Sequence, residues 1–472
     1  MTVSASVKKL LPWLVAVAFF MEALDTTILN TAVPMIASAL GVIPLSMKSV
    51  LSSYTLSLAV FIPISSWMAD KFGTRKVFST AIGLFTLGSF LCGISNSIHL
   101  LVFCRILQGC GGAMMVPVGR LTLVRTFHRS ELLQAMSFVA IPALIGPLLG
   151  PLAGGIIIRY FHWRMIFFVN IPIGLTGLFL VRKYLPDYRE KRVEKMDVLG
   201  LILFGSGIAL FSYVLEVFGE HTLGLGEVIG LLLVSATLLL GYHLHAMQTE
   251  YPLLRLKLMR IRTLRISVQG SLITRIGIGG MPFLLPLLYQ VGLGYSPLVS
   301  GLLIMPQSLA AMGLKVVVQK ILLRLGYRRV LVGNTILTGT IMMLFATIHV
   351  GTPAWLILLQ SCFFGFFSSL QYTCMNTLVY ADVKDEDTSM ASTIVSTAQQ
   401  MSLSFGVATA SLVTGFFIKD RFHSTTGEFI HGLHQAFCVL GALTMLSALV
   451  FRELRLDDGE NISQHKEAVH GH

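Results

Sequence analysis

Two acidic residues, Glu22 and Asp25, lie three positions apart inside a long apolar stretch near the start of the chain. On a helix, this spacing places both carboxyl groups on one face. A carboxylate at membrane depth costs about 2.5–3.5 kcal/mol, so it is rare unless it has a function. Such a group can take up a proton and release it again, which is the chemistry of proton-coupled transport. We expect Asp25 to carry that proton and Glu22 to assist it or to bind a cation. The alternatives are a permanently paired structural acid and an acid close enough to the membrane surface to be hydrated.

A base at the same depth is the natural partner for this acid. Arg105 lies inside another apolar stretch, and Gln108 and several small residues follow it. A guanidinium there must face a partner or a water-filled cavity, and small residues let a neighbouring helix approach. We expect an Asp25–Arg105 pair, either a switch that opens when the acid is protonated or a static ion pair.

Further polar residues at membrane depth are candidates for lining a transport cavity. They are Asn30, Gln108, Arg275 and Lys315. The two bases, Arg275 and Lys315, have no evident acidic partner in their half of the chain. They therefore either line the cavity or reach toward an interface.

The composition predicts the elements that position these residues. Of 472 residues, 54% are apolar and only 12% are charged, whereas soluble domains carry roughly 25% charged residues. With a mean hydropathy of +0.77, these values exclude a soluble domain, a disordered chain, a coiled coil and a disulfide scaffold. They leave an all-α polytopic membrane protein, because the apolar runs approach the ~20 residues of a spanning helix and do not alternate as barrel strands do. Fourteen such runs lie near residues 12–34, 50–69, 77–96, 98–118, 133–157, 163–181, 198–218, 227–246, 266–289, 298–319, 330–349, 354–376, 391–415 and 435–451.

The basic residues predict the orientation of these spans. If the N-terminus with Lys8 and Lys9 is cytoplasmic, 27 of the 35 Lys and Arg residues fall on the cytoplasmic side, five on the opposite side and three within spans. The positive-inside rule then places both termini in the cytoplasm. The net charge of +12 is explained by this topology and does not indicate nucleic-acid binding. We expect the first span to be an uncleaved anchor, since it is too long for a signal peptide.

The chain contains an internal repeat. The sequence FGTRKV at Phe72–Val77 follows the second span, and LGYRRV at Leu325–Val330 follows the tenth, 253 residues later. The same offset aligns the ninth span with the first, and such duplication is typical of secondary transporters. We expect a six-helix bundle over 1–185, an inserted helix pair with linkers over 186–260, a second six-helix bundle over 261–452 and a cytoplasmic tail over 453–472.

Motifs in the first six spans resemble those of a known transporter family. They are LDTTILNTAVP at Leu24–Pro34, SWMADKFGTRK at Ser66–Lys76, RILQGCGGA at Arg105–Ala113, GPLLGPLAGG at Gly146–Gly155 and HWRMIFFVNIPIG at His162–Gly174. Together they resemble the fourteen-helix drug:proton antiporter group (EmrB/QacA-like) of the major facilitator superfamily. The resemblance covers essentially the whole chain. It implies the major facilitator fold, two six-helix bundles plus two inserted helices, in the cell inner membrane, with multidrug efflux and antibiotic resistance as the activity.

The resemblance also implies a role for each motif. Asp25 would be the proton-coupling acid and Arg105 its modulator. The loop motif would form a cytoplasmic gate from Asp70, Gly73, Arg75 and Lys76. In that gate, Asp70 would pair with Arg75 and with a helix N-terminus in the other half; Ser66 replaces the usual first glycine, which loosens the packing slightly. The fifth-span motif would pack against the other half and seal the external side through Gly146, Pro147, Gly150, Pro151, Gly154 and Gly155.

These observations predict a proton-coupled secondary transporter that exports lipophilic, drug-like small molecules by alternating access. A dedicated exporter of a metabolite, siderophore, lipid or peptide on the same fold is the alternative. An integral membrane enzyme is a remote third hypothesis, since no paired aspartate motif or histidine cluster occurs. The expected partners are protons, a small-molecule substrate and the lipid bilayer. No nucleic acid, metal or cofactor is expected, the chain is expected to act as a monomer, and a tripartite efflux partner is left open.

Overall fold

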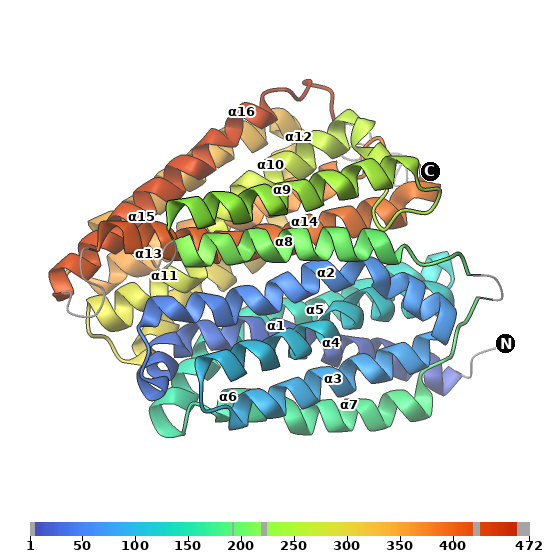
Figure 1. The fold of residues 1–472 in the computed structure, drawn as a ribbon, viewed down its shortest axis with the longest axis horizontal. Helices are drawn as coiled ribbons and strands as arrows, with labels where there is room; N and C mark the ends of the chain where they lie inside the picture. Colours follow the sequence, from blue (N-terminus) through green and yellow to red (C-terminus); the bar gives the residue numbers. More distant parts are fainter. Residues whose placement is uncertain (1–4, 191–192, 219–223, 419–424, 460–472) are drawn as a thin grey trace. The chain divides into compact units, whose positions relative to one another are not determined.

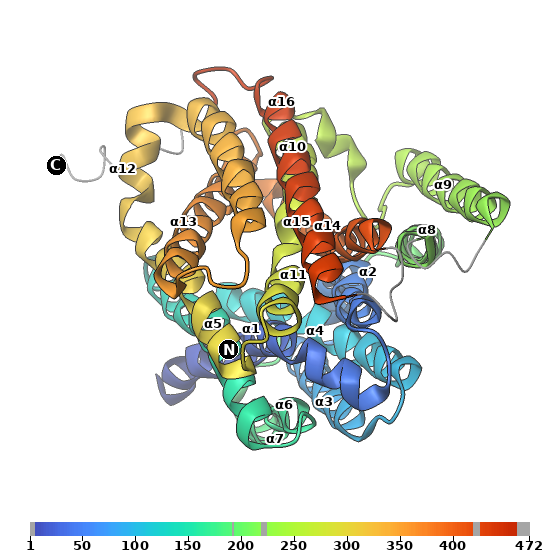
Figure 2. The same ribbon diagram turned by 90° about the vertical axis from the view of Figure 1, so that its left-hand side faces the viewer.

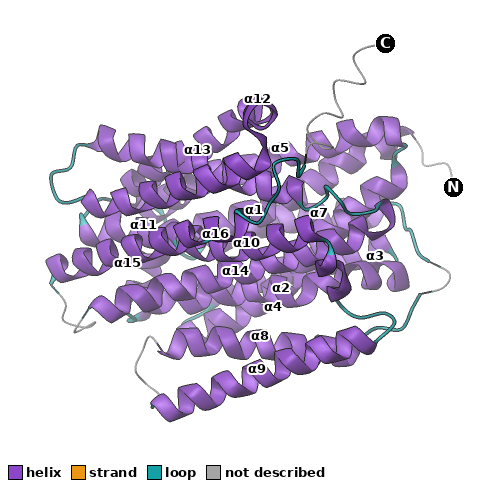
Figure 3. Ribbon diagram, turned by 90° about the horizontal axis from the view of Figure 1, so that it is seen from above, coloured by secondary structure: helices purple, strands orange, loops and turns teal. Residues whose placement is uncertain are grey.

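The computed structural model describes residues 5–190, 193–218, 224–418 and 425–459, and the regular elements within these ranges are all helical (Figure 3). Twelve of the described helical segments are long and apolar enough to cross a membrane. One of them, Pro297–Thr347, holds two spans that meet at Gly326, and a shorter apolar helix, Leu144–Tyr160, adds a further span. These helices account for the fourteen predicted spans, and the all-α polytopic fold is confirmed. Of the predicted tail, residues 460–472 lie outside the described ranges.

The chain divides into two units by its internal contacts, and the first unit comprises residues 1–202 together with Ser296–Gly301. Its helices (Figure 1) are α1 (Ala5–Leu40), η1 (Pro44–Met47), α2 (Lys48–Phe72), α3 (Thr74–Ile94), α4 (Ile98–Thr126), α5 (Arg129–Tyr160), α6 (Met165–Phe168) and α7 (Asn170–Tyr184). Helix α1 packs along α5, α4 packs against both α2 and α3, and α7 lies beside α3 (Figure 2). This packing brings α1, α3, α4 and α7 around a common interior.

The second unit comprises Leu203–Tyr295 and Leu302–His472. Its helices are most of α8 (Val198–Phe218), α9 (Leu225–Gln248), η2 (Leu256–Arg260), α10 (Arg262–Gly279), α11 (Met281–Leu287), the π-helical turn η3 (Leu288–Gly292), most of α12 (Pro297–Leu344), η4 (Phe345–Thr347), α13 (Ala354–Leu378), η5 (Asp385–Asp387), α14 (Thr388–Phe417), α15 (Thr426–Leu446) and α16 (Ala448–Phe451). Helix α10 packs against α13, α14 and α15. Helices α8 and α9 run side by side, and the Ser235 hydroxyl donates to the Gly207 carbonyl at 2.8 Å between them (Figures 1 and 3).

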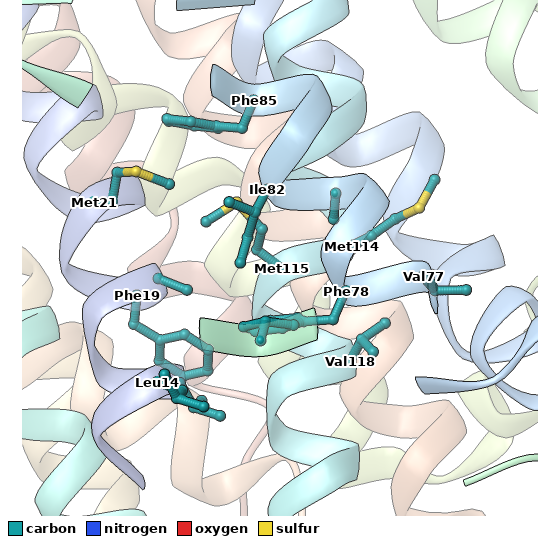
Figure 4. Close-up of a cluster of buried hydrophobic side chains, with 14 of the residues drawn as sticks. Leu14, Phe19, Met21, Val77, Phe78, Ile82, Phe85, Met114, Met115 and Val118 are labelled. Carbon is teal, nitrogen blue, oxygen red and sulfur yellow. The ribbon is translucent and has the colours of Figure 1, made fainter. Parts of the chain in front are cut away.

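Apolar side chains of α1, α3 and α4 fill the interior of the first unit, as Figure 4 shows. Those labelled there are Leu14, Phe19, Met21, Val77, Phe78, Ile82, Phe85, Met114, Met115 and Val118. Lipid tails are as apolar as these side chains, so close van der Waals packing stabilises the helix contacts more than exclusion from water does. The core therefore holds α1, α3 and α4 in a fixed register around the polar residues they carry.

The sequence repeat has a structural counterpart. Gly73 ends α2 with φ of 94°, and Gly326, 253 residues later, interrupts α12 with φ of 73°. Residues other than glycine rarely adopt this left-handed conformation, and glycine does so without steric cost. In both units the glycine turns the chain sharply between two consecutive spans. The equivalent positions of the two repeats thus share a glycine turn with positive φ.

Candidate functional site

Asp25 lies at the centre of a buried hydrogen-bond network in the first unit. Its Oδ2 accepts a hydrogen bond from Arg105 Nη1 at 2.6 Å, so the expected Asp25–Arg105 pair is present. Its Oδ1 accepts from Gln108 Nε2 and from Asn170 Nδ2, both at 2.8 Å. Asp25 and Arg105 are each 1% exposed. The carboxylate is therefore held by three donors from α4 and α7 and is shielded from solvent.

Ser89 of α3 closes the network on its other side. Its hydroxyl accepts hydrogen bonds from Asn170 Nδ2 at 2.9 Å and from Gln108 Nε2 at 3.3 Å, and it donates to the Phe167 carbonyl at 3.1 Å. Gln108 Oε1 in turn accepts from Arg105 Nη1 at 2.7 Å. Four helices, α1, α3, α4 and α7, thus share one network, and a shift of any of them changes its geometry.

The guanidinium of Arg105 also stacks on an aromatic ring. Its central carbon lies 4.1 Å from the centre of the Tyr54 ring of α2, a cation–π distance. Arg105 Nε and the Tyr54 hydroxyl have no hydrogen-bond partner among the described residues. An unsatisfied buried donor costs about 1–3 kcal/mol. Arg105 is therefore held by the two hydrogen bonds of Nη1 and by the Tyr54 ring, with no hydrogen bond at Nε.

Small residues bring the helices close enough for this network to form. A Cβ atom on Gly88 would lie 2.7 Å from Gln108 Cα, and one on Gly109 would lie 2.6 Å from Ser57 Cβ. A Cβ on Gly112 would lie 2.8 Å from the Tyr54 hydroxyl. Real Cβ atoms do not approach so closely, so these positions require glycine. The run of glycines after Arg105 is thus explained by packing of α2 and α3 onto α4.

The network has one chemical property that bears on function. Arg105, Gln108 and Asn170 all present N–H groups to Asp25, and an N–H group cannot accept a hydrogen bond. Oδ1 of Asp25 accepts two of these hydrogen bonds and Oδ2 accepts one, so three of about four lone pairs are in use. A proton on the remaining lone pair would remove the negative charge that all three donors share, and the three hydrogen bonds would weaken together.

The glycines of the fifth-span motif pack against α1 beside Asp25. A Cβ atom on Gly146 would lie 2.7 Å from the Cβ of Ala23, and Gly150 abuts Thr27. Gly154 faces the Ile28 carbonyl in the same way. The contacts of α5 thus flank Asp25 on α1 from residue 23 to residue 28. A displacement of α1 at Asp25 cannot occur without a response from α5.

The first turn of α12 continues this packing. Gly155 abuts Pro297 and Leu298, and Gly301 abuts the Pro151 carbonyl, within the first unit. The remaining residue of the motif, Pro147, lies between two of these contacts on α5, which is an unbroken helix in spite of its prolines. The expected seal on the external side stays a prediction.

A comparison with known families identifies the chain. The model of the family described as Major Facilitator Superfamily matches residues 15–407. The chain belongs to the major facilitator superfamily. It is therefore a membrane transporter and not an enzyme, and the predicted fold is confirmed.

Several relatives of this major facilitator are similar to it over nearly their full length. A protein of Cronobacter sakazakii named "Putative multidrug resistance protein MdtD" is 40% identical over 454 residues, 95% of each chain. The protein of that name in Escherichia coli is 39% identical over 455 residues, 96% of each chain. Among solved structures, the inward-facing bacterial homolog of the human lysosomal transporter Spinster matches with a TM-score of 0.67 at 12% identity, covering 95% of this chain and 97% of that one. A D-xylose–proton symporter gives a TM-score of 0.66 at 14% identity, covering 95% and 98%. Both structures show the fold alone.

The loop motif that is expected to form the cytoplasmic gate has a different ion pair from the predicted one. Asp70 pairs with Arg125 of α4, with Oδ1 and Nη2 2.8 Å apart, and the predicted pairing with Arg75 is wrong. Glu190 shares the same Arg125 nitrogen at 2.9 Å. Arg125 lies in the last turn of α4 and reaches Asp70 near the end of α2. Arg75 lies in the first turn of α3 and donates instead to the segment after α7. The predicted contact of Asp70 with a helix in the other half stays a prediction.

Arg75 and Gly73 instead fasten the segment that follows α7. Arg75 donates from its backbone nitrogen to Asp187 Oδ1 at 3.0 Å and from Nε to the Leu185 carbonyl at 2.5 Å. Gly73 abuts the same Asp187 carboxylate, where a side chain would clash. A carboxylate at the start of a helix is favoured by the helix dipole, and Asp187 occupies this position on α3. Lys76 stays outside these bonds, with its ammonium 6.0 Å from the centre of the Phe72 ring.

Two predicted residues of α1 lie outside the Asp25 network. Glu22 is half-buried, interacts electrostatically with Asp25 and Arg120, and has no hydrogen-bond or ion-pair partner for its carboxylate among the described residues. Among the described residues, Asn30 donates only to the Thr26 carbonyl of its own helix, at 3.4 Å. The structure thus separates Asp25 from both of them.

Arg275 and Lys315 belong to the second unit and are held by neutral groups. Arg275 is 6% exposed, so it does not extend to an interface. Its Nη2 donates to Asn376 Oδ1 at 3.1 Å, and Lys315 Nζ donates to Thr373 Oγ1 at 2.7 Å. Neither base has an acidic partner among the described residues.

Several residues of the site were not predicted from the sequence. Asn170 lies in the motif of the sixth span, so a search of the motifs for amide side chains would have found it. Ser89 carries no such signal, because hydroxyl groups are common in membrane helices. Arg125, Asp187 and Glu190 lie at span ends, where charges are explained by topology alone. Their roles follow only from the contacts in the structure.

Proposed function

We propose that the chain is a proton-coupled antiporter that exports lipophilic, drug-like small molecules, with Asp25 as the proton carrier. One observation carries the proposal: Asp25 is 1% exposed and its oxygens accept three hydrogen bonds, at 2.6 to 2.8 Å, from groups that can only donate. A proton on this carboxylate removes the charge that holds all three donors, so the network weakens when the proton binds. The names of the MdtD relatives support a drug-like substrate.

The cycle alternates access to one site from the two sides of the membrane. A proton from outside neutralises Asp25, frees Arg105 and favours release of the substrate outward. Loss of the proton to the cytoplasm restores the pair and resets the carrier. Since α5 packs on α1 at residues 23–28, the local change at Asp25 moves α5 as well. The cluster of Asp70, Arg125 and Glu190 steadies the cytoplasmic ends of α2 and α4 during this change.

We further propose that the protein acts as a monomer in the cell inner membrane with both termini in the cytoplasm. The distribution of 27 of 35 basic residues to one side supports this orientation. The matched glycine turns at Gly73 and Gly326 support two six-helix bundles over 1–185 and 261–452, with 186–260 as the insertion and 453–472 as the tail.

The test compares two modes of transport in the same vesicles. Inverted membrane vesicles contain wild type, Asp25→Asn or the control Glu131→Gln. Nile red, a neutral lipophilic dye, is added to the medium outside them. Glu131 is an exposed acid near the start of α5 that pairs with Lys8 at 3.1 Å. Uptake driven by a pH gradient is measured first, and exchange of dye at equal pH second. Exchange requires no net proton movement, so it reports folding and substrate binding separately from coupling.

Wild type and Glu131→Gln are expected to accumulate dye when the gradient is applied. Asp25→Asn is expected to lose gradient-driven uptake and to keep exchange at equal pH, because the amide cannot release a proton. Gradient-driven uptake by Asp25→Asn at the wild-type rate would disprove the assignment. Loss of both modes in Asp25→Asn, with the protein folded, would assign Asp25 to substrate binding instead.

A further inference from the structure

The second unit carries two cations at membrane depth without an acid to balance them. Helices α10, α12, α13, α14 and α15 contain a single acidic residue, Glu428, in the first turn of α15. Its carboxylate caps that helix by accepting from the Thr425 backbone nitrogen at 3.1 Å. Arg275 and Lys315 therefore have positive charges that no carboxylate in these helices neutralises. A charged group at this depth is costly and is a functional candidate by default.

Both charges lie well inside the membrane. Arg275 is 13 residues beyond Arg262, the first residue of α10, which corresponds to about 20 Å along the helix. Lys315 is 11 residues before the turn at Gly326, which corresponds to about 16 Å. The hydrocarbon core is about 30 Å thick. Each charge is thus at membrane depth, away from the lipid headgroups.

Arg275 is fixed in place by neutral partners alone. Its Nε donates to Ser271 Oγ at 2.9 Å and its Nη2 to Asn376 Oδ1 at 3.1 Å. Its guanidinium lies 4.0 Å from the centre of the Tyr372 ring. Gln399 Nε2 donates to the same Asn376 oxygen at 2.7 Å, so two donors share one acceptor. These contacts orient the guanidinium but leave its charge uncompensated.

Lys315 reaches the same turn of α13. Its Nζ lies 2.7 Å from Thr373 Oγ1, and Thr373 and Asn376 are three residues apart, so their side chains are neighbours on one face of the helix. The two cations thus converge on one turn of α13 from α10 and from α12. Lys315 is exposed, and Thr373 and Asn376 are only half-buried, so the turn is accessible.

The surroundings of Arg275 combine polar and apolar groups. Ser271 and Asn376, which hold the guanidinium, also line a narrow pocket whose other walls include Val379, Val395 and Ala398. A carboxylate or phosphate matches the planar fork of an arginine through two parallel hydrogen bonds. The pocket itself has no room for a water-sized molecule, so only the anionic group of a ligand is assigned to Arg275 and Lys315, and its apolar body is not placed here.

We propose that Arg275 and Lys315 form a binding site for the anionic group, a carboxylate or a phosphate, of an amphiphilic substrate. The proposal rests on the proposed function, since it names the chemical class of what the transporter carries. The arriving anion takes the place of the missing acid and balances both cations. A neutral analogue gains none of this energy. Discrimination between anionic and neutral substrates is therefore assigned to the second unit.

The test measures binding to the purified full-length protein in detergent. The probes are 1-pyrenebutyrate, which is anionic, and 1-pyrenebutanol, its neutral counterpart of the same shape, and fluorescence anisotropy gives each Kd. Wild type is compared with Arg275→Gln, Arg275→Lys and Lys315→Gln. The control is Lys320→Gln, an exposed base on the same helix as Lys315. Lys315→Gln removes an exposed side chain, so it tests the site even if Arg275→Gln folds poorly.

Wild type and Lys320→Gln are expected to bind pyrenebutyrate more tightly than pyrenebutanol. Arg275→Gln and Lys315→Gln are each expected to raise the Kd for pyrenebutyrate about 10- to 100-fold, the strength of a charged hydrogen bond. Their Kd for pyrenebutanol should not change, and Arg275→Lys should keep part of the preference because it keeps the charge but loses the planar fork.

Equal affinity of wild type for the two probes would overturn the proposal. An equal loss of affinity for both probes in Arg275→Gln and Lys315→Gln would overturn it too. Loss of the wild-type preference when phosphatidylglycerol is added would assign the site to a lipid headgroup and would overturn it as well. Binding needs no pH gradient, so Asp25→Asn should retain the preference. If wild type prefers pyrenebutyrate but does not export Nile red when a pH gradient is applied, the proposed function is refuted and the anion site stands.

Discussion

The hydrogen bond from Asn170 to Asp25 gives a quantitative prediction for a variant that lacks it. Asn170 Nδ2 donates to Asp25 Oδ1 at 2.8 Å, and this bond stabilises the charged carboxylate over the protonated form. A hydrogen bond to a charged group contributes about 1.5–3 kcal/mol, and 1.36 kcal/mol corresponds to about one pH unit. In Asn170→Ala, the pH at which substrate affinity falls by half should therefore rise by about one to two units.

The assay is the affinity of purified protein for Nile red between pH 5 and pH 9, read from the dye's fluorescence. In the proposed cycle, protonation of Asp25 releases substrate, so affinity falls as the pH is lowered. Asn30→Ala is the matched control, because Asn30 lies on α1 with Asp25 but donates only to the Thr26 carbonyl. A midpoint in Asn170→Ala that equals the Asn30→Ala midpoint, or that moves to lower pH, would refute this account of the network.

Three further predictions follow from packing and charge. Gly88→Ala should destabilise the protein by about 1–3 kcal/mol, because its methyl group would collide with the Gln108 backbone; Gly83→Ala, which has open space around it, should leave the thermal midpoint unchanged. Gly73→Ala should lower the same midpoint, since φ of 94° strains any other residue by about 1 kcal/mol or more; an unchanged midpoint would contradict the assigned backbone role. Arg125→Gln should change global stability by no more than about 1 kcal/mol, as expected of a partly exposed pair. It should nevertheless speed limited proteolysis of the segment after α7, because Arg125 pairs with Glu190 of that segment, and a wild-type cleavage rate would show that this pair does not hold the segment.

Much of the fold could be predicted from the sequence, because helices that cross a membrane must be long and apolar. The Asp25–Arg105 pair was equally accessible, since few charges lie at that depth and opposite charges there must pair. The offset of 253 residues located both glycine turns, at Gly73 and Gly326, without structural information. The span lengths, the pairing of opposite charges at membrane depth and the repeat offset each restricted the structure strongly enough to be predicted from sequence.

The contacts of neutral residues and of charges at helix ends could not be predicted in this way. Ser89 resembles many other serines in membrane helices, and only the approach of α3 to α4 places it beside Asp25. Arg75 and Arg125 are both close to Asp70 in a plausible topology, and the choice between them depends on the direction in which α3 and α4 end. Hydropathy does not determine how each helix is rotated about its own axis, and that rotation decides which of these side chains meet.

The central claim is that Asp25 exchanges a proton for substrate, and proton release on substrate binding tests it most directly. Purified protein in weakly buffered detergent solution is mixed with saturating Nile red near the pH midpoint of binding, and a pH indicator reports released protons. Wild type should release protons on binding. Asp25→Asn carries a neutral amide in place of the acid, so it should bind the dye with lower affinity and release no protons. Equal proton release by wild type and Asp25→Asn would contradict the account.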